Sequence, residues 1–121
     1  MVAALFDTCI LIDYLNGIPE ARDELQRFDD IAISIVSWIE VMTGTKPETE
    51  APVRAFLNQF KLMPLTSVIA EASVQIRRLD RLRLPDAIIR ATAETERRIL
   101  VTRDEKAFGP GGPGVRIPYR L

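Results

Sequence analysis

The fold is decided by the stretch AALFDTCILIDYLNG at residues 3–17. Its first four residues are apolar and predict a buried strand over residues 3–6, as expected where both faces of a sheet are covered. Residues 8–16 carry apolar side chains at helical spacing and run into Asn16-Gly17, so they predict a helix that ends there. Asp7 therefore lies where a strand passes directly into a helix.

The rest of the chain repeats this alternation of short apolar runs and helical periods. Further strands are predicted at residues 31–35, 62–65, 99–102 and 115–119, the last at a sheet edge because Pro118 lacks a backbone donor. Helices are predicted at residues 19–28, 37–43, 53–60, 68–82 and 85–97. Strands separated by helices indicate an α/β fold in three layers, with a central parallel sheet of four to five strands flanked by helices. The length of 121 residues predicts a single domain over residues 1–121.

Composition restricts the chemistry that the chain supports. It has no histidine and one cysteine, which excludes histidine-based triads and dyads, intrachain disulfides, and zinc sites built from histidine or several cysteines. The 16 basic and 17 acidic residues nearly balance, so the chain is neither a polybasic nucleic-acid coat nor an acidic tail. Chemistry must therefore come from carboxylates, hydroxyls, Arg or Lys, or a hard metal ion held by oxygen.

The apolar segments of the chain are short. None is long enough to cross a bilayer, and the first apolar residues reach Asp7 without a basic region or a long apolar core. We therefore expect a cytoplasmic protein that has no signal peptide and no membrane partner.

Four acidic residues are predicted to lie at one edge of the sheet. Asp7 follows the first strand, Glu40 lies in the first turn of the helix after the second strand, and Asp104 comes two residues after the fourth. Asp86 begins the preceding helix and joins them if that helix starts near the same edge. Ligands of open parallel sheets bind beyond the carboxyl ends of the strands. Four acids there repel one another, so a divalent cation is expected, and an all-oxygen ligand set suits Mg²⁺ or Mn²⁺.

Each of these acids also fits a purely structural role, and the residues alone leave that alternative open. Ser37 and Glu40 have the spacing of a capping box, and Asp7 is suited to cap the first helix. Asp86 complements the dipole of its helix, and Asp104 suits a turn. The structural interpretation weakens when the four are considered together.

Four motifs resemble those of PIN-domain proteins, in order and at the family's spacing. They are LFDTCILIDYL at residues 5–15, SIVSWIE at 34–40, LPDAIIRATA at 84–93 and LVTRD at 100–104. The resemblance covers nearly the whole chain, and the chain's size and first motif are most similar to the VapC-type toxins of bacterial and archaeal toxin–antitoxin pairs. Many relatives carry Asn where this chain has Asp104, followed three residues later by an Asp, where this chain has Ala107. The loop at residues 109–114 also looks longer than usual in the family.

The resemblance implies a Mg²⁺-dependent, or Mn²⁺-dependent, endoribonuclease that hydrolyses RNA phosphodiester bonds and acts as the toxin of such a pair. The residues that it assigns as catalytic, and as direct or water-mediated metal ligands, are Asp7, Glu40, Asp86 and Asp104. Thr8 and Thr102 are candidates to orient these carboxylates. Ordinary hydroxyls at helix starts are an equally good interpretation of both threonines.

Contacts to the RNA backbone need cations near the acids. The candidates are Arg77, Arg78, Arg81, Arg83 and Arg90, which flank Asp86 in the sequence. A solvated helix face is the alternative explanation for these arginines. Trp38 is expected in core or dimer packing rather than stacked on a base. Asp13 is expected to face solvent or a capping partner.

The resemblance also implies partners. VapC-type relatives form two-fold dimers and are silenced by an antitoxin segment, so we expect a homodimer and a cognate VapB-type antitoxin whose Arg or Lys competes with the metal. A protein partner needs an exposed apolar patch. The residues expected to supply it are Ile12, Tyr14, Leu15, Phe28, Trp38, Met42 and Phe56.

Other interpretations of an Asp after the first strand fit less well. A haloacid-dehalogenase-like phosphatase needs a second Asp at the position of Cys9, and a receiver domain needs a phosphorylatable Asp after the third strand, where residues 62–66 offer none. The remaining alternative is a catalytically silent PIN-like module that binds RNA or a protein partner. The presence of all four acids argues against it.

Overall fold

The computed structural model describes residues 2–121 and contains, within them, five strands, seven α-helices and one short 3₁₀ helix. The strands are β1 (Ala3–Phe6), β2 (Asp30–Ser34), β3 (Lys61–Met63), β4 (Ile99–Val101) and β5 (Val115–Arg116). The helices are α1 (Thr8–Leu15), α2 (Pro19–Gln26), α3 (Ile35–Thr43), the 3₁₀ helix η1 (Pro47–Thr49), α4 (Glu50–Leu57), α5 (Ser67–Asp80), α6 (Leu84–Thr95) and α7 (Glu105–Phe108). All predicted strands and helices are present, most of them shorter than predicted, whereas η1 and α7 are additional.

The five strands form one parallel sheet in the order β3-β2-β1-β4-β5, which confirms the predicted fold class. The chain moves outward from β1 to β2 and β3 and then returns to the other side of β1 for β4 and β5. The strand order therefore reverses between β1 and β4. We call the side where the strands end the carboxyl edge, which begins with Asp7 after β1 and Thr102 after β4, and the opposite side, marked by Asp30 and Arg98, the amino edge.

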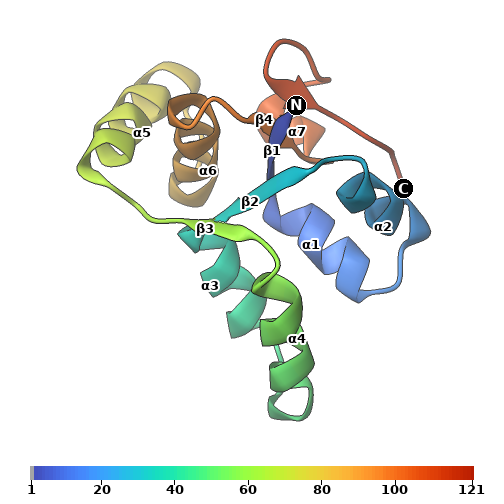
Figure 1. Cartoon of the computed structure of the whole chain (residues 1–121). Coiled ribbons are helices and arrows are strands. Elements are labelled where there is room, and N and C mark those ends of the chain that lie inside the picture. The colour runs from blue at the N-terminus through green and yellow to red at the C-terminus, as the bar shows by residue number, and fades with distance from the viewer. Residues whose placement is uncertain (1) are drawn as a thin grey trace.

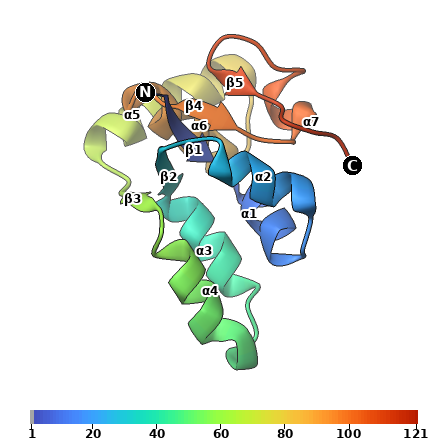
Figure 2. The same ribbon diagram turned by 45° about the vertical axis from the view of Figure 1, so that its right-hand side comes forward.

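The sheet separates two helical layers. Successive strand residues point to opposite faces, so Phe6 and Val101 pack toward α1 and α4, whereas Leu5 and Leu100 pack against Ile89 of α6. Figure 1 shows α1 and α2 on one side of the sheet and α5 and α6 on the other. Figure 2 shows that α3 and α4 run side by side and extend away from the sheet. The result is the predicted three-layer arrangement.

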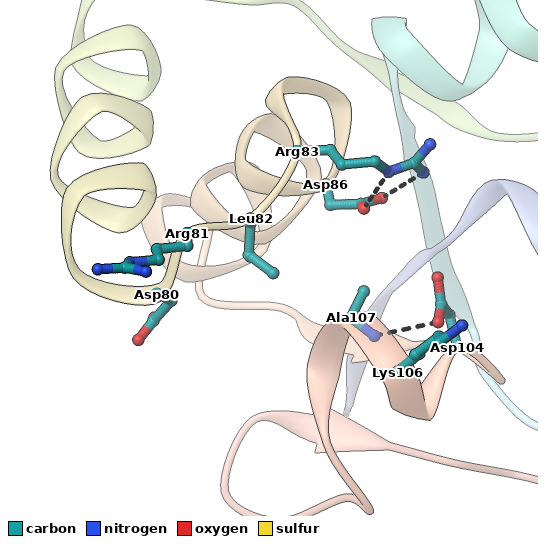
Figure 3. Close-up of a pocket in the computed structure, with 8 residues that line it drawn as sticks. All are labelled: Asp80, Arg81, Leu82, Arg83, Asp86, Asp104, Lys106 and Ala107. Carbon is teal, nitrogen blue, oxygen red and sulfur yellow. Dashed lines mark hydrogen bonds and ion pairs between the residues drawn. The ribbon is translucent and has the colours of Figure 1, made fainter.

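The starts of α6 and α7 face one another at the carboxyl edge (Figure 3). Pro85 lies in the first turn of α6, where its missing N–H costs no helical hydrogen bond, and Asp86 follows it in that turn. Asp104 caps α7, since its Oδ1 accepts from the Ala107 amide at 3.1 Å. Helix α6 therefore does begin at the same edge as the strand ends.

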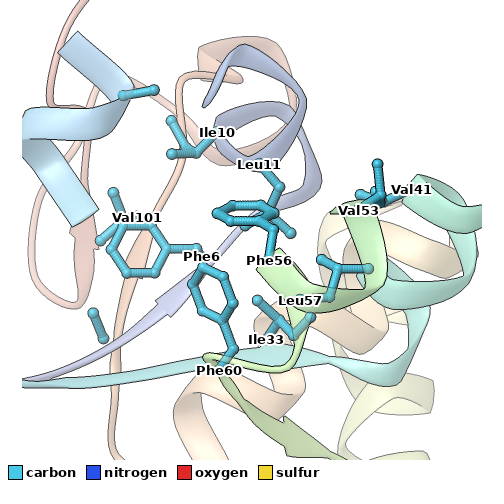
Figure 4. Packing of buried hydrophobic residues seen from close by; sticks show 12 residues of the cluster. Phe6, Ile10, Leu11, Ile33, Val41, Val53, Phe56, Leu57, Phe60 and Val101 are labelled. Carbon is cyan, nitrogen blue, oxygen red and sulfur yellow. The ribbon is translucent and has the colours of Figure 1, made fainter. Parts of the chain in front are cut away.

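The main apolar core lies between the sheet and helices α1 to α4 (Figure 4). Phe6 of β1 packs edge-on against Phe28 and Phe60, with ring centroids 5.8 and 6.0 Å apart. Phe56 stacks on Tyr14 at 4.4 Å, which joins α4 to α1. The apolar face predicted for residues 53–60 is buried in this core and consists of Val53, Phe56, Leu57 and Phe60.

The exposed apolar surface differs from the predicted one. The main core absorbs five of the seven residues predicted to supply it, namely Tyr14, Phe28, Trp38, Met42 and Phe56, whereas Ile12 and Leu15 are exposed. The prediction was wrong because this core covers Phe56 fully and the other four partly, through contacts such as Tyr14 on Phe56. Further exposed apolar side chains lie between β3 and the start of α6: Leu62, Leu65, Val68, Val74, Leu79 and Leu84. Among residues 2–121, no helix combines the length and apolar composition needed to cross a membrane.

Candidate active site

The ends of neighbouring strands supply the first polar side chains of the site. The helix that follows each strand needs acceptors for its first N–H groups. Asp7 meets this need after β1, where its Oδ1 accepts from the Thr8 amide at 2.8 Å, and Ser34 meets it after β2, where its Oγ accepts from the Val36 amide at 3.0 Å. Because β1, β2 and β4 are adjacent and parallel, these caps lie at one edge with Thr102.

Asp7 is a buried carboxylate, only 5% exposed, and its contacts are all to uncharged donors. Its Oδ2 accepts from Thr102 Oγ1 at 2.7 Å and lies 3.6 Å from Cys9 Sγ. No Lys or Arg within residues 2–121 forms an ion pair with it. Burial raises the pKa of Asp7, the hydrogen bond from Thr102 opposes that rise, and nearby Asp86 adds to it. Asp7 is therefore a buried carboxyl group that no Lys or Arg within residues 2–121 neutralises.

Glu40 reaches the same edge through Thr8. Thr8 Oγ1 donates to Glu40 Oε1 at 2.7 Å, and the same hydroxyl lies 2.9 Å from Ser37 Oγ. Helix α3 begins at Ile35 and is capped by Ser34, so Glu40 lies in the second turn rather than the first. The predicted capping box of Ser37 and Glu40 is wrong, because Ser37 lies fully buried inside the helix. Glu40 is thus free of a capping role and is directed to Thr8.

Asp86 is held by an arginine of its own segment. The Arg83 Nε donates to Asp86 Oδ2 at 3.1 Å, and Arg83 Nη2 lies 3.5 Å from Oδ1. The hydrogen bond and charge of Asp86 raise the pKa of the Arg83 guanidinium, and the charges of Glu40 and Asp104 raise it further. Asp86 is 7% exposed, whereas the Arg83 side chain is 73% exposed. A solvent-exposed cation therefore lies near three of the four predicted acids.

Asp104 shares a pocket with Asp86. The pocket has a volume of about 390 Å³ and lies between the α5–α6 turn and α7 (Figure 3). Its other lining residues are Asp80, Arg81, Leu82, Arg83, Lys106 and Ala107. The Asp104 amide donates to Thr102 Oγ1 at 3.0 Å, so Thr102 contacts both Asp7 and Asp104. The Thr8 hydroxyl thus contacts the Glu40 carboxylate, and the Thr102 hydroxyl contacts the Asp7 carboxylate and the Asp104 backbone.

The four acids meet through shared partners rather than through direct contacts. Within residues 2–121 no three acidic or thiol side chains converge tightly enough to ligate one ion in their present rotamers. Like charges repel, and the acids turn instead to backbone amides, hydroxyls and Arg83. The donor set still fits a hard divalent cation, because it offers only oxygen atoms and because buried Asp7 has no counter-ion.

The structure divides the five predicted arginines. Arg81 and Arg83 line the pocket beside Asp86 and Asp104. Arg90 instead pairs with Asp80 and Glu94, at 2.7 and 3.1 Å. Arg77 donates to the Leu82 carbonyl at 3.2 Å, and Arg78 lies exposed in the last turn of α5. Lys106 also lines the pocket, and the four motifs did not identify it. Its position two residues after Asp104 is the sequence signal that could have placed it near the acids.

Asp13 also departs from its predicted place. It is 4% exposed, and its carboxylate binds Arg103, 90 positions away in sequence, so the expectation of solvent or a capping partner is wrong. Trp38 lies partly buried against the main core, with the Arg54 guanidinium 5.5 Å from its ring centroid. This agrees with the preference for packing over base stacking.

Comparisons with known proteins match this arrangement. The family model described as PIN domain matches residues 4–109. The chain is 35% identical to Ribonuclease VapC10 of Mycobacterium tuberculosis over 100 residues, which cover 76% of this chain and 75% of that protein. A toxin–antitoxin complex from Klebsiella pneumoniae contains a chain that is 45% identical, with a TM-score of 0.93 over 98% of this chain and 100% of that one.

A more distant solved structure has the same fold. The DNA-bound VapBC complex from Salmonella typhimurium aligns with a TM-score of 0.78 over 97% of each chain, at 25% identity. The PIN-domain match covers most of the chain, and the alignment with Ribonuclease VapC10 covers about three quarters of both proteins. The chain belongs to the PIN-domain family and is a ribonuclease of the VapC type.

Proposed function

We propose that this protein is a Mg²⁺-dependent or Mn²⁺-dependent endoribonuclease that hydrolyses RNA phosphodiester bonds as the toxin of a toxin–antitoxin pair. The observation that carries the proposal is Asp7, a buried carboxylate at the carboxyl edge that has hydroxyl partners and no cation. Leaving such an anion uncompensated is costly, so its retention favours a ligand that supplies the missing charge. A structural cap needs no such burial.

The residues that would hold the ion are Asp7, Glu40, Asp86 and Asp104. Thr8 and Thr102 donate to Glu40 and Asp7, which fixes the rotamers of these carboxylates before an ion arrives. When bound, the ion activates water as a nucleophile and offsets charge that develops on the scissile phosphate. One of these carboxylates also accepts a proton from the attacking water.

Cations at the pocket rim are suited to hold the RNA backbone. Arg81, Arg83 and Lys106 line the pocket that contains Asp86 and Asp104. The exposed side chain of Arg83 can leave Asp86 for a phosphate once a metal ion neutralises the acids. Arg77, Arg78 and Arg90 are proposed to extend this track along α5 and α6.

We propose that a VapB-type antitoxin silences the site by placing an Arg or Lys among the four acids. The pairing of Arg83 with Asp86 supports the idea that a guanidinium is accepted there in place of a metal ion. Two of the similar chains of known structure come from a toxin–antitoxin complex of Klebsiella pneumoniae and from the DNA-bound VapBC complex of Salmonella typhimurium. The antitoxin should therefore inhibit less as Mg²⁺ rises, and inhibition that ignores Mg²⁺ would place it elsewhere.

We also propose a homodimer. The apolar side chains exposed between β3 and the start of α6 support a second surface for association, in addition to Ile12 and Leu15. Light scattering at micromolar concentration should give twice the monomer mass. A monomer mass at that concentration would contradict the proposal.

RNA cleavage with and without metal tests the proposed activity. Purified protein is incubated with tRNA and rRNA in Mg²⁺, in Mn²⁺ or with EDTA, and the fragments are mapped. Asp7→Asn should abolish cleavage, whereas Asp23→Asn, which changes an exposed acid on α2, should cleave as the wild type does. Equal cleavage by Asp7→Asn or in EDTA would contradict the assignment. Binding of RNA without any cleavage would favour the catalytically silent alternative.

A further inference from the structure

A partly buried ion-pair cluster is built around Asp13, next in the chain to the residues of the carboxyl edge. Asp13 of α1 accepts three hydrogen bonds: from Arg103 Nε to Oδ2 at 2.7 Å, from Arg103 Nη2 to Oδ1 at 2.8 Å, and from the Tyr119 hydroxyl to Oδ2 at 2.7 Å. The cluster joins the first helix, the segment after β4 and the C-terminal segment. Arg103 and Tyr119 are 90 and 106 positions after Asp13 in the sequence.

The hydrogen bonds between Arg103 and Asp13 are of a strong type, because both partners carry a charge. Two parallel N–H bonds from one guanidinium to one carboxylate fix the direction of both side chains. Burial acts to raise the pKa of Asp13, but the hydrogen bonds from Arg103 and Tyr119 outweigh it and hold that pKa below its usual value. The carboxylate is therefore charged and satisfied, and the Arg103 cation is not available for an RNA phosphate.

The cluster is connected to the site by the chain itself. Arg103 stands between Thr102, which donates to Asp7, and Asp104, whose amide donates back to Thr102. The Arg103 amide also points to Cys9 Sγ at 3.5 Å. Cys9 and Asp13 are one helical turn apart on α1, so one face of that helix holds both the backbone and the side chain of Arg103.

We propose that Asp13 and Tyr119 are positioning residues that act through Arg103 to hold Asp104 and Thr102 in place for the divalent ion. The inference rests on the proposed metal-dependent function and deepens it. Asp104 is an N-cap on a helix of only four residues, which by itself fixes the carboxylate weakly. The anchored Arg103 supplies the rigidity that the short helix lacks.

The same strand offers a matched control. Arg98 precedes β4 as Arg103 follows it, and Arg98 Nη1 pairs with Asp30 Oδ1 at 2.8 Å at the amino edge. The Arg98 side chain is 7% exposed and that of Arg103 is 33% exposed, and both guanidiniums bond to a carboxylate. A Lys at either position keeps the charge and loses the planar fork. The Arg98 variant loses contacts at the amino edge, and the Arg103 variant loses the bidentate pair beside the carboxyl edge.

The test is Mn²⁺ binding to the full chain, measured by calorimetry well below the unfolding temperature. Arg103→Lys should weaken Mn²⁺ affinity by about tenfold, whereas Arg98→Lys should bind as the wild type does even if both lower the melting temperature. In an Asp104→Asn background, Arg103→Lys should have little further effect, because it acts through Asp104. Equal affinity of Arg103→Lys and wild type, or equal weakening by both Lys variants, would overturn the inference.

A second readout needs no metal. Amide hydrogen exchange at Ala107 reports the cap to Asp104 Oδ1, and it should accelerate in Arg103→Lys and in Tyr119→Phe but not in Arg98→Lys. If the wild type fails to bind Mn²⁺ while Ala107 exchange responds in this way, the proposed function fails and the positioning holds. If Mn²⁺ binds and Ala107 exchange is unchanged, only the positioning is overturned.

Discussion

The two edges of the sheet treat acidic side chains in opposite ways. At the amino edge, Asp30 receives Arg98 at 2.8 Å and Lys61 at 3.2 Å, and their hydrogen bonds lower the pKa of Asp30. At the carboxyl edge, Asp7 is buried without a cation, and that burial raises its pKa. The amino edge therefore favours the folded chain by itself. The carboxyl edge pairs Asp86 with Arg83 but leaves the buried Asp7 without a cation, which a bound metal ion would supply.

The largest expected effect is on stability at the amino edge. Arg98→Met removes a buried guanidinium that contacts Asp30 and the Ala4 carbonyl, and it should lower the free energy of unfolding by about 3 kcal/mol. Urea unfolding measures this loss. RNA cleavage per folded molecule should stay at the wild-type level. A variant that is fully stable would show that the amino edge contributes nothing.

Asp7→Asn should lower RNA cleavage and leave stability intact, the reverse of what is expected for Arg98→Met. Cleavage should fall about 100-fold or more, equivalent to about 2.7 kcal/mol in the barrier, because the ion loses a charged ligand. The metal-free variant should be at least as stable as the wild type, since it no longer buries an unpaired anion. Parallel urea unfolding and cleavage assays check both effects. A large loss of stability would make Asp7 a structural cap only.

Thr102→Val tests whether hydroxyls organise the carboxyl edge. The change keeps the shape but removes the donor to Asp7 Oδ2 and the acceptor for the Asp104 amide, which should cost about 1 to 2 kcal/mol. Cleavage should fall about tenfold. Thr92→Val is the matched control, because Thr92 is equally buried but donates to the Ile88 carbonyl within α6. Equal cleavage by the two variants would contradict the assigned role of Thr102.

The smallest expected effect is a pH dependence. Because Asp13 has a lowered pKa in the folded chain, its pairing adds stability above the unfolded value of 3.8 and loses it as pH falls through the folded pKa. Tyr119→Phe should cost about 1 kcal/mol near neutral pH, and the difference from wild type should shrink below that value. Urea unfolding across acidic pH measures it. A difference that is constant with pH would show that the hydroxyl does not act on Asp13.

Most of the fold followed from local patterns. The strands at residues 3–6 and 99–101 are apolar throughout, and the helices carry their apolar faces at regular spacing. The 3₁₀ helix η1 and helix α7 were not predicted, because three or four residues are too few to show a helical repeat of apolar side chains. The start of α3 was predicted two residues late because Ile35 and Val36 look like a continuing strand, whereas the cap at Ser34 ends β2 there.

The sequence indicated which acidic residues gather at the carboxyl edge, but not which side chains contact one another around it. Asp7, Glu40 and Asp104 follow strands, and parallel topology gathers such residues at one edge. The partner of Asp13 could not be found in the same way, since Arg103 and Tyr119 lie in distant segments and no local period relates them. The predicted apolar surface failed for a similar reason, because contacts such as Tyr14 on Phe56 depend on how α1 and α4 are placed.

Anomalous diffraction from crystals soaked in Mn²⁺ tests the central claim most directly. The account predicts one or more peaks at the carboxyl edge, within ligand distance of Asp7 and Asp86, with Arg83 moved away from Asp86. The same soak of Asp7→Asn should weaken or abolish the signal. Strong peaks elsewhere, or none at the carboxyl edge in well-diffracting wild-type crystals, would contradict a shared metal site built from Asp7, Glu40, Asp86 and Asp104.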